Sequence, residues 1–341
     1  MPATKKTVTK KKPTSNKKPT TKKSVAKKAP VAKKQTTKKV VKKPTEKKTV
    51  KKPAMKKEKN ISIKNEGKEK MINFVNIFEA AKFGTVEDVK YFIEKEKVDV
   101  NAKTTGGGSS LSIAVFTNAV QKKDDLALIE YLINAGANIN DKFAGPNGET
   151  VLLIALRFGA KPALIKMLVN KGADVDMADN NHNQSALHSV SEIIDLDIET
   201  AKLIVSKSKN IELPDTWGNT PLHQACMAGN VKMLEVLLSY GANIDKPNYR
   251  DFTPLHTAVD SLQIGCIQYL VSRRADVNAP CEDNWTPLHF AAQSGNVEIA
   301  RILVDAGAST NARTARGSTA LMMARQFGHY DLERYLSSRT Y

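Results

Sequence analysis

The sequence predicts an all-α solenoid of about eight helix-turn-helix units with hairpin fingers, preceded by a disordered basic tail. The first observation is a tetrapeptide, Thr-Pro-Leu-His, which begins at Thr220, Thr253 and Thr286 and so recurs every 33 residues. A fixed period of this length is typical of a repeat array, in which each unit packs against its neighbours. The second observation is a change of composition near residue 70, which separates the array from the tail.

The net charge shows the same division. The chain holds 53 Lys and Arg against 35 Asp and Glu, a formal charge of +18. Its first 70 residues hold 27 Lys and four Glu, or +23, so the remaining residues carry −5. The basic character therefore belongs to the tail alone, and the function of the array has to be argued separately.

Eight units follow from aligning the chain on the first residue of the tetrapeptide. We expect a disordered tail over residues 1–60, a transition segment over 61–73 and a repeat domain over 74–341. The second unit is longer because of an insertion around Asn118–Asp125 and a longer loop at Lys142–Gly145, both expected at the surface. The expected units are 74–107, 108–148, 149–183, 184–218, 219–251, 252–284, 285–317 and 318–341.

Each position of the unit has a physical role. Thr220 can cap the first helix, and Pro221 suits the first helical position because its missing N–H has no intrahelical partner. Gly229 ends that helix, where a positive φ is needed. Leu237 lies on the core face of the second helix, and the phrase Gly241–Asp245 ends that helix and leads into an extended finger.

These motifs resemble those of the ankyrin repeat family over residues 74–341. The resemblance implies an α-solenoid whose concave face, built from first helices and finger tips, binds other proteins. Three departures put local geometry in question. Leu262 replaces the usual glycine after a first helix, Ser206–Lys209 replaces the Gly-Ala phrase, and Asp251 replaces the finger glycine.

Four histidines occupy the motif position, and they invite a metal-binding interpretation. Units stacked about 10 Å apart cannot share one ion at ligand distances of about 2.1 Å. We therefore expect each ring to bond backbone in its own or the adjoining turn, and we predict no metal and no cofactor. The four residues are His188, His223, His256 and His289.

The cysteines and glycines offer no catalytic pattern. Three cysteines without a CxxC spacing support neither a disulfide framework nor a zinc finger, and they favour a reducing compartment. Cys226 and Cys266 fall at packing positions, whereas Cys281 falls in a finger loop where exposure is expected. Gly106–Gly108 lacks the Lys and Ser/Thr of a phosphate-binding loop. We predict no enzymatic activity and no small-molecule substrate.

The binding surface is expected around repeats five to seven. Family geometry would place the residue after the motif histidine, and the residue three positions further on, on the concave side. Aromatic side chains in the fingers match the composition of interface anchors. The alternative is that Phe252 and Trp285 pack against the next finger and only stiffen the stack. The candidate partner-binding residues of this monomeric repeat domain are Trp217, Gln224, Met227, Tyr249, Arg250, Phe252, Trp285 and Phe290.

The tail is rich in Lys pairs and prolines, and it contains no arginine or aromatic residue over residues 1–60. The strings AKKAP, VAKK and KKPT resemble the tails of linker histones and bacterial histone-like proteins, which implies non-specific DNA or RNA binding. Without Arg forks or stacking rings, such binding is electrostatic. The candidate nucleic-acid contacts are Lys17, Lys18, Lys22, Lys23, Lys27, Lys28, Lys33, Lys34, Lys38 and Lys39.

Other roles remain open for the tail. It could lie on anionic lipid, serve as an import signal, or fold back and mask the binding face. A membrane role is disfavoured because no long apolar run or lipidation glycine accompanies it. We expect an intracellular protein, in a nucleus or in a bacterial nucleoid or cytoplasm.

Two hypotheses for the function of the whole chain follow. The first is an adaptor that tethers a protein partner to nucleic acid, and the second is a stand-alone scaffold whose tail only directs localisation.

Overall fold

The computed structural model describes residues 61–65, 68–72 and 74–339. Within those ranges it contains sixteen α-helices, which form eight consecutive pairs. This confirms the predicted solenoid of about eight helix-turn-helix units. The ten Lys side chains proposed as nucleic-acid contacts lie outside the described residues.

A short β-hairpin precedes the first helix pair. Strand β1 (Ile61–Asn65) pairs antiparallel with β2 (Lys68–Ile72), so that Ile61 lies opposite Ile72 and Asn65 opposite Lys68. The sequence predicts only a transition segment here, so these strands are a feature that the repeat pattern does not indicate. The all-α description holds for the repeats.

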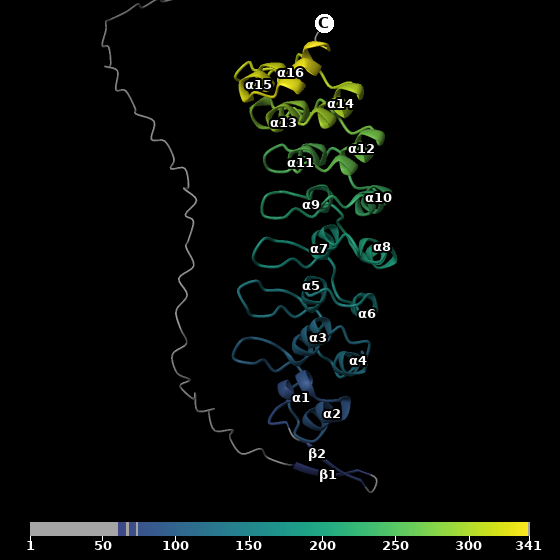
Figure 1. Cartoon of the computed structure of the whole chain (residues 1–341). Coiled ribbons are helices and arrows are strands. Elements are labelled where there is room, and N and C mark those ends of the chain that lie inside the picture. The colour runs from purple at the N-terminus through teal and green to yellow at the C-terminus, as the bar shows by residue number, and fades with distance from the viewer. Residues whose placement is uncertain (1–60, 66–67, 73, 340–341) are drawn as a thin grey trace, which may run out of the picture. The chain divides into compact units, whose positions relative to one another are not determined.

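The helix pairs are stacked in sequence order. Figure 1 shows the first helices in the middle of the stack, with hairpin fingers on one side and the second helices on the other. The first helices are α1 (Ile77–Phe83), α3 (Ser110–Gln121), α5 (Val151–Arg157), α7 (Ala186–Glu192), α9 (Pro221–Ala228), α11 (Pro254–Asp260), α13 (Pro287–Ser294) and α15 (Ala320–Phe327). The second helices are α2 (Val86–Glu94), α4 (Ala127–Asn134), α6 (Pro162–Asn170), α8 (Ile198–Lys207), α10 (Val231–Ser239), α12 (Ile264–Ser272), α14 (Val297–Asp305) and α16 (Tyr330–Ser337).

The core runs continuously through the stack. Each first helix packs against the next first helix, and leucines such as Leu222, Leu255 and Leu288 are buried between them. Leu237 and Leu270 are equally buried on the second helices. Each unit therefore covers the apolar face of its neighbour, which is why the period of the sequence becomes the period of the fold.

Six of the eight first helices are followed by a residue in the left-handed backbone conformation, with or without glycine; α1 and α7 are the exceptions. Gly229 and Gly295 have φ of +75° and +73°, as expected for a helix C-terminus. Leu262 takes the same position in the sixth unit with φ of +56°. In the fingers, Asp251 has φ of +57° where Gly218 has +81°. The two substitutions therefore keep the geometry of the repeat and bear its strain.

The fourth unit ends without the Gly-Ala phrase, and a residue of the third unit holds it instead. Helix α8 ends at Lys207, and Ser208 follows with an extended backbone. Asp176 of the preceding unit accepts a hydrogen bond from the hydroxyl of Ser208 and another from the backbone N–H of Lys209, at 2.5 and 2.8 Å. Charge-assisted bonds to a neighbouring loop thus stabilise the turn that glycine would otherwise favour.

The insertion in the second unit lies partly inside the stack. We expected residues around Asn118–Asp125 at the surface, but α3 continues through Gln121 and Asn118 is only 4% exposed. The Asn118 amide donates to the carbonyl oxygen of Asp125 at 2.9 Å. The expectation was wrong for Asn118 and Ala119, which are buried because they belong to the extended helix, whereas residues 120–125 are exposed as expected.

Candidate protein-binding face

The motif histidines join consecutive units. Nδ1 of His223 accepts a hydrogen bond from the backbone N–H of Thr220 at 3.2 Å, which places the proton on Nε2. Nε2 lies 2.8 Å from the carbonyl oxygen of Phe252, in the next finger. His188, His256 and His289 repeat both contacts in their own units.

Burial keeps these rings neutral. Desolvation lowers the pKa of His223 to about 4 and that of His256 to about 4, although the backbone carbonyl that each ring bonds opposes the shift. Desolvation also lowers the pKa of His188 and of His289. No group of three metal-ligating side chains occurs among the described residues. The prediction that the rings bond backbone is confirmed.

The cysteines are buried. Burial raises the pKa of the Cys266 thiol to about 11 and that of the Cys281 thiol to about 11, and it raises the pKa of Cys226 well above its usual value. The expected exposure of Cys281 was wrong: it is 6% exposed, because its finger folds over it and its backbone N–H bonds the carbonyl oxygen of Trp285 at 2.8 Å. A thiol that stays protonated at neutral pH is a poor nucleophile.

We call the surface made by the first helices and the fingers the finger face. Four of the candidate partner-binding residues line one hollow of about 270 Å³ on its sixth and seventh units, which we call the aromatic hollow. The complete lining is Arg250, Phe252, Cys281, Glu282, Asp283, Trp285, Phe290 and Gln293.

Ring contacts organise the aromatic hollow. The Phe290 ring lies edge-on to Phe252, with centroids 5.1 Å apart, and lies 5.0 Å from Trp285. The Arg250 guanidinium is 4.9 Å from the Phe252 centroid and 3.3 Å from a carboxylate oxygen of Glu282. Phe252 is 9% exposed, so it forms the floor of the hollow, whereas Trp285 and Phe290 are half-buried.

The other four candidates lie apart from this hollow. Trp217 is 51% exposed and stacks on the ring of His182, with centroids 4.9 Å apart. Tyr249 is 72% exposed and Met227 is 45% exposed. Gln224 is buried, contrary to its expected place on an open surface, and its amide donates to the Glu192 carboxylate.

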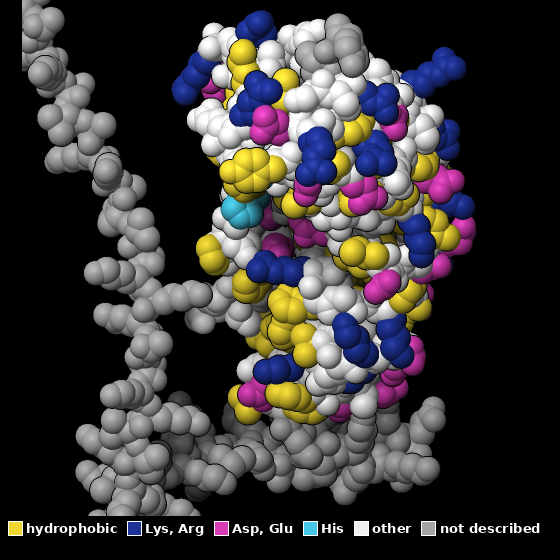
Figure 2. Space-filling model, turned by 45° about the horizontal axis from the view of Figure 1, so that its top comes forward, with side chains coloured by type: hydrophobic (Ala, Val, Ile, Leu, Met, Phe, Trp, Pro, Cys, Tyr) yellow, Lys and Arg dark blue, Asp and Glu magenta, His cyan; other side chains and the backbone are white. Residues whose placement is uncertain are grey.

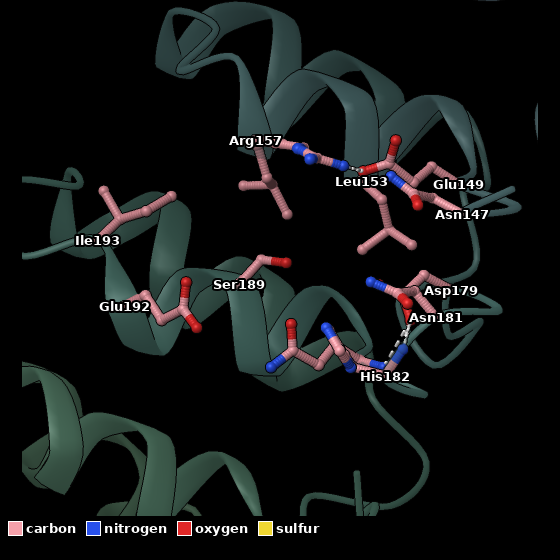
Figure 3. A pocket seen from close by; sticks show the side chains of 12 residues that line it. Asn147, Glu149, Leu153, Arg157, Asp179, Asn181, His182, Ser189, Glu192 and Ile193 are labelled. Atoms are coloured by element: carbon pink, nitrogen blue, oxygen red, sulfur yellow. Dashed lines mark hydrogen bonds and ion pairs between the residues drawn. The ribbon is translucent and has the colours of Figure 1, made fainter. Parts of the chain in front are cut away.

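A second hollow, which the sequence analysis did not name, lies between α5 and α7. This polar hollow has a volume of about 360 Å³. In Figure 3, Leu153 and Arg157 face it from α5, Ser189 and Glu192 from α7, and Asp179 and His182 from the finger before α7. Figure 2 shows a hollow on this face with acidic side chains inside and a histidine at its edge.

Three carboxylates and one guanidinium line the polar hollow. Arg157 donates to Glu149 at 2.7 Å, and that carboxylate, with Asp179 nearby, raises the pKa of Arg157. Asp179 also accepts from the backbone N–H groups of His182 and Gln184. Desolvation raises the pKa of Glu192, and the bond from Gln224 opposes this shift.

A third hollow, between α3 and α5, is apolar. It has a volume of about 320 Å³ and adjoins the polar hollow at Glu149, which lines both. The Phe116 and Phe158 rings meet edge-on with centroids 4.8 Å apart, and they are 40% and 38% exposed. The remaining lining residues of this apolar hollow are Ser112, Ile113, Phe143 and Ile154.

A sequence signal for these two hollows was present. The offsets that selected Gln224 and Met227 in the fifth unit select Ile113 and Phe116 in the second, and Ser189 and Glu192 in the fourth. In the described part of the chain, no helix is long and apolar enough to cross a membrane.

A family model described as ankyrin repeats (3 copies) matches residues 116–192, 191–281 and 265–340. The chain belongs to the ankyrin repeat family. Proteins built from ankyrin repeats typically serve as interaction scaffolds, in agreement with the open finger face described above. The resemblance of the tail to histone-like tails gains no support from this match, because the matched residues begin at 116.

Two curated proteins are similar in sequence to part of this ankyrin-repeat chain. An intracellular phospholipase A2 of Caenorhabditis elegans is 27% identical over 143 residues, which are 40% of this chain and 12% of that protein. The ankyrin repeat and SAM domain-containing protein 6 of Mus musculus is 30% identical over 131 residues, 38% of this chain and 14% of that protein. The matches therefore span less than a sixth of either relative.

Among solved structures, the ankyrin repeat domain of Bcl-3, a member of the IkappaB protein family, has a similar fold. The TM-score is 0.57 at 26% sequence identity, and the match covers 67% of this chain and 99% of that one. The likeness supports the ankyrin-repeat solenoid.

Proposed function

We propose that this protein is a non-enzymatic adaptor whose ankyrin repeats bind a protein partner through the finger face, while its basic tail tethers the complex to nucleic acid. The observation that carries the first half is the aromatic hollow. Trp285 and Arg250 are residue types enriched among binding hot spots, and Phe290 is of a type enriched at interfaces; the three gather around a concave surface instead of being scattered.

Electrostatics favour a partner segment with both an apolar and a charged group in this place. Arg250 is 68% exposed on its side chain and already pairs with Glu282, and Asp283 also lines the hollow, so its rim carries one positive and two negative charges. An apolar anchor packing onto the exposed parts of the Trp285 and Phe290 rings would displace water from them, which is the main favourable term in such contacts.

A capture experiment tests the protein-binding half. Full-length protein and the Trp285→Ala variant are used as baits in lysate. Lys232→Ala, at an exposed position of the second helix α10, is the control. Partners that bind the wild type and the control, but are lost from Trp285→Ala, support the proposal. Equal recovery by all three baits would show that the aromatic hollow does not bind the partner.

The nucleic-acid half rests on charge alone, since 27 of the Lys residues lie in the first 70 positions. Full-length protein is expected to bind random-sequence DNA with a slope of log K against log salt near −9 if about ten phosphates are engaged. A chain of residues 71–341 should not bind. Equal affinity of the two would refute the tether. Relocalisation of a reporter by residues 1–60 without nucleic-acid retention would favour a scaffold whose tail only directs localisation.

The phospholipase named among the relatives does not change this proposal. The shared segment is 12% of that protein, and the described residues here offer no exposed nucleophile of low pKa among their cysteines.

A further inference from the structure

We propose a second binding site, on repeats two to four, that takes an extended segment of a partner protein with an apolar side chain and a basic side chain three residues apart. The apolar hollow would hold the first side chain and the polar hollow the second. This surface is distinct from the aromatic hollow, and the inference goes beyond the proposed function.

The apolar hollow is suited to one large aliphatic or aromatic side chain. Phe116 and Phe158 stay more than a third exposed although they touch each other, and Ile113 and Phe143 are half-buried beside them. Covering such rings removes apolar surface from water at about 25 cal/mol per Å². Figure 2 shows hydrophobic side chains gathered on this face next to the acidic hollow.

Charge complementarity selects a basic group for the polar hollow. Glu149, Asp179 and Glu192 face a single guanidinium, that of Arg157, so the lining has an excess of negative charge. Arg157 is committed to Glu149, and Asp179 to its own finger. Glu192 projects from α7 with one oxygen bonded to Gln224, which leaves the other oxygen available to a cation (Figure 3).

Geometry fixes the spacing of the two anchors. The hollows lie between consecutive first helices, α3 and α5 for one and α5 and α7 for the other, and they share Glu149. Packed helices lie about 8–10 Å apart, so the two hollows are about that far apart. A chain in the extended polyproline II conformation advances about 3.1 Å per residue and completes a turn every three residues. Side chains three residues apart therefore point to the same side and span the step.

A peptide array tests the spacing with the full-length protein. Ser/Gly octapeptides carry Leu and Arg at separations of one to five residues, in both chain directions. Binding is measured for each member by fluorescence polarisation. We expect a maximum at a separation of three, at least tenfold above a separation of one, and a loss of about tenfold when Arg is replaced by citrulline. Binding that ignores separation, or no binding at millimolar peptide, would overturn the proposal.

Three variants assign the two anchors. Phe116→Ser should weaken the best peptide about tenfold, whereas Glu192→Gln, which keeps a polar group opposite Gln224, should abolish the preference for Arg over citrulline. Trp285→Ala in the aromatic hollow should change neither, and urea midpoints show whether each variant is folded. Weakening by Trp285→Ala alone would place the peptide in the aromatic hollow and refute this site without refuting the adaptor role. Concentration-dependent dimerisation that Phe116→Ser abolishes would identify a second copy as the occupant and also refute it.

Discussion

Nε2 of His223 lies 2.8 Å from the carbonyl oxygen of Phe252, so one imidazole ties the first helix of the fifth unit to the finger of the sixth. His188, His256 and His289 make the same contact with the units that follow them. The tetrapeptide therefore stabilises the junction between units as well as the helix that contains it. Because each ring is buried, it stabilises the junction only when neutral.

Acid should weaken the stack through these histidines. Desolvation lowers the pKa of His223 and of His256 from 6.5 to about 4, so the unfolded chain takes up protons first as the pH falls. Each neutral ring contributes fully to the free energy of unfolding above about pH 7, and this contribution declines between pH 6.5 and 4. At pH 5 the loss is about 2 kcal/mol per ring. Urea unfolding followed by circular dichroism at pH 7.5 and 5.0 measures this loss.

His223→Gln provides the comparison for the acid experiment. The variant should be less stable at pH 7.5, because the amide does not reproduce both ring contacts, yet it should lose less stability between pH 7.5 and 5.0 than the wild type does. An identical pH dependence in the two proteins would contradict the role given to the ring.

Leu262 bears strain that glycine would relieve. It ends α11 with φ of +56° and is 48% exposed, so it gains little from burial. We expect Leu262→Gly to raise the free energy of unfolding by about 1 kcal/mol, since the left-handed conformation costs about 1–2 kcal/mol per residue with a side chain. Denaturant melts of the two proteins test this.

Gly328→Ala is the matched opposite change. Gly328 has φ of +75°, and a Cβ added there would meet no atom within 4 Å, so the substitution tests backbone conformation without a clash. It should lower the unfolding free energy by about 1 kcal/mol. Effects of the same sign in Leu262→Gly and Gly328→Ala would show that strain is not the cause.

Alanine substitutions of Phe252 and Tyr249, which lie in the same finger, should differ in their effect on stability because only the first ring is buried. Phe252 is 9% exposed and underlies Phe290, so Phe252→Ala is expected to cost about 3 kcal/mol of stability. Tyr249 is 72% exposed, and Tyr249→Ala should change stability by less than about 0.5 kcal/mol. Thermal or urea unfolding of the two variants measures this difference in stability. A small effect for Phe252→Ala would exclude the packing role that the burial implies.

The thiols should react slowly in the folded protein. Cys226, Cys266 and Cys281 are all buried, and burial raises the pKa of Cys281 to about 11. We expect negligible labelling by a chromogenic disulfide reagent at pH 8 within minutes, and three equivalents after addition of guanidinium chloride. Rapid labelling of Cys281 in the native protein would show that its finger opens. Rapid labelling of Cys226 or Cys266 would show that the packed helices separate.

Part of the candidate surface was predictable and part was not. Arg250, Trp285 and Phe290 were selected from the sequence because fingers and first-helix offsets repeat with the period, and these side chains do line one hollow. Gln224 satisfied the same rule, but it is buried because Glu192, one unit earlier, offers its amide a carboxylate. The position of a residue within the repeat predicts which way its side chain points in its own unit. It does not predict which residue of the neighbouring unit lies beside that side chain.

The sequence by itself determined the number of units, the ankyrin-repeat fold and the backbone-bonding role of His223, because helix caps, helix ends and periodic burial depend on residues close together in the chain. Only the tertiary structure decided that Cys281 and Asn118 are buried and that Phe116 and Phe158 meet. The Phe116–Phe158 contact joins residues far apart in the chain, the burial of Asn118 depends on how the insertion folds, and that of Cys281 depends on how its finger folds. Their outcome depends on the packing of several units at once, which local preferences do not specify.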